Sequence, residues 1–377
     1  MRRYIWQRPD WPDFHVSVEQ VLPEIELVRH KQGAFKGVLA FTDREQREQA
    51  LIEAAAASAV QTSAIEGETL NWDAVRSSVA RRLGVDRAGL PQDDRTEGVV
   101  AMTLDATRNY EPPLTESRMF QWHSELFPRM LGQRERDIVI GSWRQPAGDP
   151  MQVISGPLGR ERIHFEAPPA SNVPGEMRKF IAWFNTSRGT ENGLIRAAIA
   201  HLRFLTVHPL ADGNGRIGRA IADMALSQDE KSADRFYSMS AQIHREKQSY
   251  YEMLERAQRS SLDVTEWVKW FIGCLARAVD ASQHIAERTR RAAEFWNDHA
   301  SANLNERQRT VLHRVLGNFD GDLNLRKYIA ISGAPRATAQ RDLANLAQRG
   351  ILVPAGAGKA TRYQIPPPPN DNDTGTY

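Results

Sequence analysis

The chain reads His208-Pro-Leu-Ala-Asp-Gly-Asn-Gly-Arg-Ile-Gly-Arg219 near its middle. Apolar spacing before this stretch predicts a helix over residues 192–207, and Pro209 stops that helix because proline lacks an amide donor. Gly213-Asn-Gly215 predicts a tight turn into a second helix that continues to about Ser227. Backbone N–H groups at the start of a helix bind anions, so the stretch predicts an anion site between two helices.

The polar side chains of this stretch are the groups that phosphate chemistry needs. Arg216 and Arg219 are three residues apart, so both lie on nearly one face of the helix, where they can bind polyphosphate oxygens. Asp212 offers the carboxylate oxygen that Mg²⁺ takes beside substrate phosphates. His208 has a neutral lone pair near pH 7 and can accept a proton from a hydroxyl. We therefore predict an enzyme that acts at phosphorus rather than an ordinary capped turn with solvated arginines.

The stretch resembles the signature of the Fic family, His-Pro-Phe-x-Asp/Glu-Gly-Asn-Gly-Arg-x-x-Arg. It matches at every signature position but one, where Leu210 stands in place of the phenylalanine. Both are apolar packing residues. The resemblance implies a protein adenylyltransferase, which moves AMP from ATP to a Tyr, Thr or Ser hydroxyl of a target protein or of itself. Pyrophosphate would leave, and the reaction would use Mg²⁺.

The resemblance also implies a role for each residue of the stretch. His208 would be the general base, Asp212 would hold Mg²⁺, and Asn214 would orient the α-phosphate. The backbone around that asparagine would cradle the phosphates, and two arginines would bind the β- and γ-phosphates. The nucleotide-binding residues implied are Asp212, Gly213, Asn214, Gly215, Arg216 and Arg219.

Two further segments fit the same resemblance. Tyr250 and Tyr251 follow the second helix by about thirty residues, and an aromatic of this segment borders the adenine in the family; packing of one of them in the core is the alternative. Short β-prone pieces at 151–155 and 162–165 predict a hairpin. It is similar to the family's flap, so we expect a target segment to pair with residues 151–165 by strand addition.

A brake on the reaction is implied by Thr62-Ser-Ala-Ile-Glu66-Gly67. Taken alone, this is a helix end with a glycine cap. Beside the Fic signature it resembles the inhibitory pattern Ser/Thr-x-x-x-Glu-Gly/Asn of the class with an N-terminal inhibitory glutamate. The carboxylate of Glu66 would pair with Arg219 and repel the γ-phosphate.

Composition limits the remaining choices. The 377 residues are 41% hydrophobic and 25% charged, with a net charge of +2, which is typical of a soluble globular protein and not of a chain that is basic throughout. The single cysteine, Cys274, excludes an internal disulfide and is interpreted as a core residue in a reducing compartment. Neither a signal peptide nor an apolar run of about 18 residues is present, so we expect a cytoplasmic protein without a membrane span.

The expected fold class is mainly α: a Fic-type helical core with a β-hairpin flap, an N-terminal helical module and a C-terminal winged helix-turn-helix. Helices at 305–316, 325–332 and 336–349, followed by β-prone pieces at 351–353 and 361–365, predict the winged helix. The expected domains are an N-terminal module at 1–90 with the inhibitory motif at 62–67, a catalytic core at 91–275, a linker helix at 276–302, the winged helix at 303–366 and a disordered tail at 367–377.

Alternative functions remain open at this point. The winged helix carries Arg336, Arg341 and Arg349 on its last helix, with Lys359 and Arg362 on the wing, which suits duplex DNA or a protein partner. A DNA-binding transcriptional regulator is therefore the second hypothesis. A Fic enzyme that transfers UMP, phosphate or phosphocholine, or that removes AMP, is the third. The oligomeric state is open, and a homodimer is one of its alternatives.

Overall fold

The computed structural model describes residues 4–40, 44–85, 93–128, 139–146, 150–156, 160, 162–299, 301–316, 321–356 and 361–366. Its residues divide into two compact units, Met1–Gln283 and His284–Tyr377. The helix α11 (Thr265–Asp298) begins in the first unit and ends in the second. Each unit is described by itself below.

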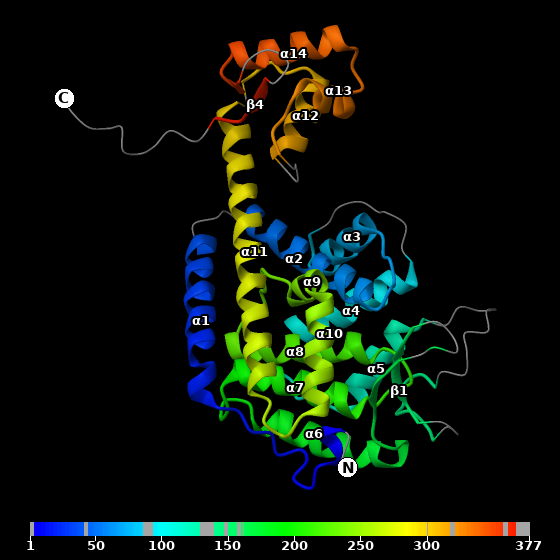
Figure 1. Ribbon diagram of the computed structural model, residues 1–377. Coiled ribbons are helices and arrows are strands. Elements are labelled where there is room, and N and C mark those ends of the chain that lie inside the picture. The colour runs from blue at the N-terminus through cyan, green and yellow to red at the C-terminus, as the bar shows by residue number, and fades with distance from the viewer. Residues whose placement is uncertain are drawn as a thin grey trace. The chain divides into compact units, whose positions relative to one another are not determined.

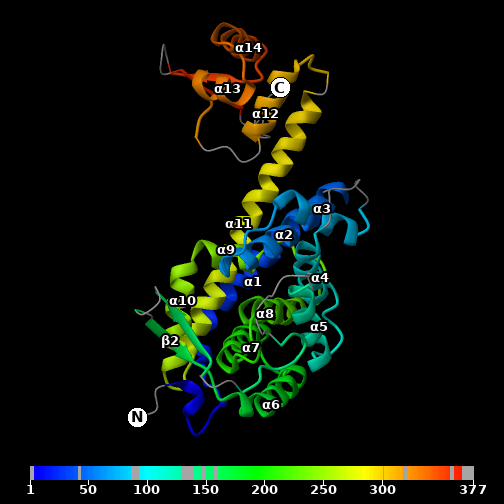
Figure 2. The same ribbon diagram turned by 90° about the vertical axis from the view of Figure 1, so that its right-hand side faces the viewer.

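Two packed helices form the centre of the first unit, α7 (Gly193–Val207) and α8 (Asn214–Glu230) (Figures 1 and 2). Every residue of α7 from Leu194 to Val207 is buried, as expected of a helix that is apolar on most of its faces. At Gly218 of α8 an added Cβ would lie 3.1 Å from the Leu205 side chain, so the missing side chain lets the two helices approach closely. This central pair places the loop between the two helices on a rigid support.

The other helices of the first unit surround this pair (Figure 1). Among them, α1 runs along the first part of α11: Lys31 contacts Asp280, and the Ser17 amide donates to Thr265 Oγ1. The surrounding helices are α1 (Val18–Ala40), α2 (Arg44–Ile65), α3 (Trp72–Arg82), α4 (Asp94–Arg108), α5 (Glu116–Leu126), α6 (Val173–Thr186), α9 (Met239–Arg245) and α10 (Lys247–Arg259), with short 3-10 turns at Ile5–Gln7 and Ala170–Asn172. Within the part of the chain that the structure describes, none of the helices combines the length and apolar character needed to cross a bilayer.

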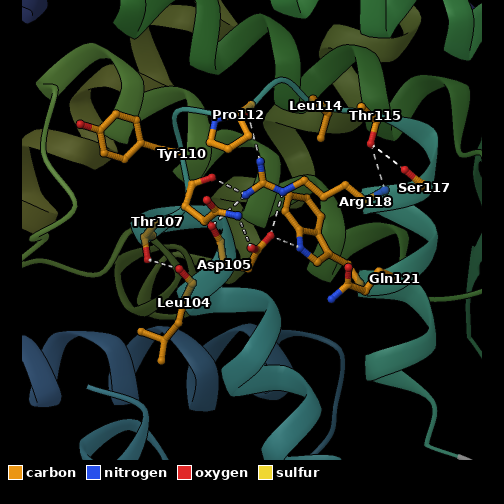
Figure 3. A network of polar contacts seen from close by, with 12 residues as sticks. Leu104, Asp105, Thr107, Tyr110, Pro112, Leu114, Thr115, Ser117, Arg118 and Gln121 are labelled. Carbon is orange, nitrogen blue, oxygen red and sulfur yellow. Dashed lines mark hydrogen bonds and ion pairs between the residues drawn. The ribbon is translucent and has the colours of Figure 1, made fainter. Parts of the chain in front are cut away.

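A buried arginine braces α4 against α5. Arg118 Nε donates to Asp105 Oδ2 at 2.8 Å, and its Nη atoms donate to backbone carbonyls, among them that of Pro112 (Figure 3). The same Asp105 oxygen accepts from Trp122 Nε1 at 2.8 Å. Because the buried charge is paired and fully surrounded by acceptors, it specifies the α4–α5 geometry. The end of α5 then carries Phe127 to the loop before α8.

The predicted hairpin is confirmed as β1 (Gln152–Ser155) and β2 (Arg162–Glu166), which pair antiparallel. Val153 pairs with Phe165 and Ile154 with Ile163, so the register skips one residue and makes a β-bulge. Phe165 is buried and packs edge to face on Tyr4, which ties the hairpin to the N-terminal segment.

The second unit has its own core. Its elements are α12 (Glu306–Leu316), α13 (Leu325–Ser332), α14 (Arg336–Gln348) and the antiparallel pair β3 (Val353–Ala355) and β4 (Arg362–Gln364). Tyr328, Leu343 and Ile351 are among the residues of one apolar cluster. This is the element order expected of a winged helix; the winged helix itself stays a prediction. Residue 359 on the wing and the tail at 367–377 lie outside the described residues.

Three expectations about the helices were wrong or incomplete. The 23-residue α1 was not predicted, because Pro23 and two glycines interrupt its pattern. Amphipathic spacing over residues 116–130 predicts one helix there, but α5 ends at Leu126, since Pro128 disfavours helical backbone at the residue before it. The linker helix expected at 276–302 belongs to α11, which begins at Thr265 and includes the apolar run around Trp267.

Candidate active site

The signature loop, residues 208–213, begins at His208, which caps α7 in the left-handed conformation with φ 51°. Such backbone is uncommon for a residue with a side chain and is typical of functional sites. Its amide donates to Phe204 O at 2.9 Å, and its Nδ1 lies 3.3 Å from Leu205 O. The tautomer that donates from Nδ1 leaves a lone pair on Nε2. His208 as a whole is half-buried.

The environment keeps this imidazole neutral. Burial lowers the pKa of His208 to about 4, against the opposing contribution of the Leu205 carbonyl; the charge of Arg144 lowers it further. The nearby carboxylates of Glu66 and Asp212 act in the opposite direction without restoring the ordinary value. At neutral pH the side chain is therefore a free base that can accept a proton.

Asn214 holds the signature loop closed through hydrogen bonds to its backbone. Its Oδ1 accepts from Leu210 N at 3.0 Å, and its Nδ2 donates to Leu210 O at 2.8 Å, while only 2% of the residue is exposed. The amide expected at the α-phosphate is thus engaged on both sides by the loop backbone. In this structure Asn214 shapes the turn, and Leu210, fully buried, occupies the apolar position of the signature.

The glycines on either side of Asn214 leave room for other groups. Gly213 has φ 80°, and an added Cβ would lie 3.2 Å from the Phe127 ring. Its amide donates to Asp212 Oδ1 at 2.6 Å. At Gly215 an added Cβ would lie 2.0 Å from Oε1 of Glu66. The carboxylate of Glu66 therefore occupies the space at the start of α8 that the glycine leaves open.

Glu66 is held there by Arg219. The helix α2 ends at Ile65, and Gly67 follows with φ 86°, so the turn directs Glu66 onto α8. Arg219 Nη2 donates to Glu66 Oε1 at 2.7 Å, and Arg219 also donates to the Thr62 hydroxyl and carbonyl at 2.8 Å each. Only 3% of the Arg219 side chain is exposed. Burial alone would raise the pKa of Glu66, but Arg219 and Arg216 hold it below its usual value, so the carboxylate is ionised.

The second arginine of the signature is paired as well, with a partner that was not predicted. Arg216 Nη1 donates to Glu68 Oε2 at 2.8 Å, its guanidinium lies 5.1 Å from the Phe127 ring centre, and its Nη2 is 3.9 Å from Asp212 Oδ1. Its side chain is 2% exposed. The turn after α2 thus supplies one carboxylate to each arginine. The sequence feature that could have indicated this partner is the presence of two glutamates two residues apart in that turn.

The two tyrosines have different places. Tyr250 is 1% exposed, and its hydroxyl lies 2.8 Å from His201 Nε2, so it packs in the core near Arg219, the alternative that the sequence left open. Tyr251 is 39% exposed, and its hydroxyl donates to Ile65 O at 3.4 Å, beside the Glu66 turn. Of the two residues predicted for the adenine, the structure places only Tyr251 at an open edge of the site.

Arg144 connects the signature loop to the hairpin, and no pattern in the sequence indicated this residue. Its Nε donates to His208 O at 2.8 Å, its amide donates to Pro209 O at 2.9 Å, and its Nη2 contacts Pro168 O. Arg144 precedes β1, and Pro168 follows β2. The guanidinium therefore links the backbone of His208 to the segment that follows β2.

Among the described residues, His, Cys, Asp and Glu side chains form no cluster of three that could hold a metal ion. Asp212 is the acidic residue of the loop, and 55% of its side chain is exposed. A single exposed carboxylate fits the way Mg²⁺ is held when substrate phosphates and water complete its coordination. The donor set therefore suits a metal that arrives with a nucleotide.

Comparison with known proteins agrees with this geometry. Residues 113–226 match the Fic/DOC family, and residues 4–85 match a domain of unknown function, DUF4172. Curated relatives named protein adenylyltransferase Fic include one from Drosophila ananassae, 23% identical over 58% of this chain, and one from Aedes aegypti, 26% identical over 57%. The matched regions span 40% and 39% of those relatives.

Solved structures show a related fold. A Fic family protein from Desulfovibrio desulfuricans aligns with a TM-score of 0.53 at 20% identity, covering 93% of this chain and 97% of that one. A Fic domain protein from Bacteroides thetaiotaomicron aligns with a TM-score of 0.52 at 18% identity, covering 69% and 97%. The fold is that of the helical Fic-type proteins. This chain carries a Fic/DOC family domain at residues 113–226, and that domain contains the whole signature from His208 to Arg219.

Proposed function

We propose that this chain is a protein adenylyltransferase that moves AMP from ATP to a protein hydroxyl and is held inactive by Glu66. The observation that supports this most is the position of the Glu66 carboxylate at Gly215, where it is bonded to Arg219 and is close enough to His208 to interact with it electrostatically. A carboxylate that fills an anion site at a helix start excludes a phosphate from the same place.

In this mechanism the triphosphate replaces Glu66 at the start of α8. Arg219 and Arg216, released from their carboxylates, bind the β- and γ-phosphates. Nε2 of His208 takes the proton of the acceptor hydroxyl, whose oxygen attacks the α-phosphorus while pyrophosphate leaves. Asp212 would hold Mg²⁺, which neutralises phosphate charge when bound. The acceptor segment of the target would pair with the hairpin of β1 and β2.

Labelled nucleotides test this proposal. The wild type, Glu66→Gly and His208→Ala chains are incubated with α-labelled ATP, CTP, GTP or UTP, and label on protein is measured. Label that follows ATP, rises in the first variant and disappears in the second supports AMP transfer and both roles. Label from another nucleotide would assign a different group to the same site, and loss of label from a protein that already carries AMP would assign removal.

The second ion pair gives a separate prediction. Glu68→Gln is expected to raise AMP incorporation by roughly 2- to 10-fold, because freeing a partly buried pair of about 1 kcal/mol releases Arg216 for phosphate. Combined with Glu66→Gly it should add to the effect of that variant. Initial rates with α-labelled ATP measure both. Glu19→Gln, at an exposed glutamate of α1, is the control for the change in charge. A Glu68→Gln rate equal to that of wild type would contradict an inhibitory role for the Glu68–Arg216 ion pair.

Duplex DNA is the second candidate ligand, and it concerns the second unit alone. Residues 303–366 carry ten Lys and Arg against four Asp and Glu, a net +6 in a chain whose total is +2. A groove between α13, α14 and β4 is lined by residues that include Asn324, Arg326, Arg336, Gln340, Arg362 and Tyr363. A local basic surface of this kind supports phosphate binding.

The dependence of DNA affinity on salt tests this candidate with the full chain. Replacing both Arg326 and Arg336 by Ala is expected to weaken binding to all duplex sequences and to reduce the slope of log affinity against log salt by about 1 for each phosphate that is no longer neutralised. Arg44→Ala in the first unit is the matched control. Absence of binding at low salt would leave a protein partner as the interpretation of this surface.

A further inference from the structure

A serine and a histidine of the hairpin form a hydrogen-bonded chain with a glutamate of α10. Ser155 Oγ lies 2.6 Å from His164 Nε2, and His164 Nδ1 lies 2.7 Å from Glu255 Oε2. The tautomer protonated at Nδ1 donates to the carboxylate and leaves Nε2 to accept from the serine. This is the arrangement in which a hydroxyl is activated by a base that a carboxylate orients.

The backbone is built around this histidine. His164 is the residue that the register of β1 and β2 skips, so the bulge in the hairpin falls on it. Arg259 of α10 donates to the carbonyls of His164, at 2.7 and 3.0 Å, and of Ile163, at 2.9 Å. Bulges redirect side chains and occur next to active sites. Here the bulge directs His164 between Ser155 and the carboxylate on α10.

The surroundings of Ser155 favour an anionic reactant. Ser155 is exposed, and its partner across the strands is Arg162, whose side chain is 70% exposed. Burial alone would raise the pKa of Glu255, but hydrogen bonds from His164 and Arg162 hold it below its usual value, so Glu255 is ionised at neutral pH. The Ser155 hydroxyl is therefore bonded to a histidine that an ionised carboxylate orients, and it has an arginine as its neighbour across the strands.

The helix α10 connects this group to the turn that carries Glu66. Glu255 is four residues after Tyr251 on α10, so the two side chains lie on the same face about 6 Å apart along the helix. Tyr251 in turn reaches Ile65, the residue before Glu66. The helix α10 thus joins the serine, through Glu255 and His164, to the edge of the site where Glu66 lies.

We propose that Ser155 is an activated acceptor that takes AMP onto this chain itself, an inference that rests on the proposed adenylyltransferase function. The Oγ of Ser155 attacks the α-phosphorus of ATP bound at a Fic site, the bond from that phosphorus to the bridging oxygen of the β-phosphate breaks, and pyrophosphate leaves. For this acceptor the proton of Oγ passes to Nε2 of His164 in place of His208, and Glu255 stabilises the imidazolium. The product is a phosphodiester between AMP and Ser155.

Two tagged copies of the full chain test this assignment. The donor copy is Glu66→Gly; the acceptor copy is His208→Ala, which keeps the serine group. After incubation with α-labelled ATP, the modified residues of both copies are mapped by mass spectrometry, and pyrophosphate release is measured. AMP is expected on Ser155, with label lost when the acceptor also carries Ser155→Ala and lowered at least about 10-fold with His164→Ala, the loss of a general base. Ser171→Ala, another exposed serine, is the control.

The outcomes separate this inference from the function beneath it. AMP on other residues of both copies, or equal label on the Ser155→Ala acceptor, overturns the assignment while the adenylyltransferase function holds. A donor that neither releases pyrophosphate nor labels any protein contradicts the proposed function instead. A fluorophosphonate probe, which needs no ATP, reports the activation alone: labelling at Ser155 that is lost in His164→Ala supports it, and an unlabelled Ser155 overturns it.

Discussion

Glu66→Gly is expected to raise the initial rate of AMP incorporation by about 10- to 100-fold, which corresponds to removing roughly 1.4 to 2.8 kcal/mol from the barrier. The carboxylate occupies the space above Gly215 and holds Arg219 at 2.7 Å, so ATP must displace both contacts before its phosphates reach the helix start. Glycine removes the carboxylate and leaves the turn, which already tolerates glycine at the next residue. Label from α-labelled ATP measures the change.

The same substitution should lower the stability of the fold while it raises the rate, and these opposite effects make the test specific. Arg219 keeps its two bonds to Thr62 but loses its charged partner while 3% exposed, and a charge left unpaired in that way costs roughly 1–3 kcal/mol. The melting temperature of Glu66→Gly should therefore fall without nucleotide and recover when ATP is added. Glu66→Gln keeps the size of the side chain and loses its charge, so its melting temperature should lie between those of wild type and Glu66→Gly. An unchanged rate in Glu66→Gly would contradict the brake.

The helices around the signature could be predicted because their signals are local. An apolar stripe before Pro209 and glycines after it define the end of α7 and the start of α8 in sequence alone, and the hairpin follows from two β-prone pieces. The helix α1 could not be predicted in the same way. Proline and glycine weaken its local pattern, and its stability comes from packing along α11, which is more than two hundred residues away.

The site shows the same division between local and distant information. His208, Asp212 and the two arginines are adjacent in sequence, so their chemistry could be inferred from the residue types. The partners that set their state come from elsewhere: Glu68 from the turn after α2, and Arg144 from the segment before the hairpin. The burial of Tyr250 likewise depends on His201, 49 residues away. Apart from the two glutamates of the turn after α2, spacing in the sequence does not indicate these contacts.

His208→Ala is expected to lower AMP transfer by about 10²- to 10⁴-fold, the usual contribution of a general base. The comparison is made in the Glu66→Gly background, where the rate is high enough to measure the loss. The neutral state of the ring also sets a pH profile. With the pKa of His208 at about 4, kcat/KM of Glu66→Gly should stay flat between pH 7.5 and about 5.5 and fall only as the pH approaches 4. A fall centred near 6.5, the value of an unperturbed histidine, would contradict this environment.

The same pKa links the base to stability, and the sign follows from which state binds more protons. Between about pH 6.5 and 4 the unfolded chain protonates His208 while the folded chain keeps it neutral, so stability is lost as the pH falls through this window. Alanine at this position cannot take up that proton. The melting temperature of His208→Ala should therefore fall less than that of wild type between pH 7 and pH 4. Equal losses in the two chains would mean that the imidazole is already solvated, and a solvated ring would lack the free lone pair at low pH on which its role as base depends.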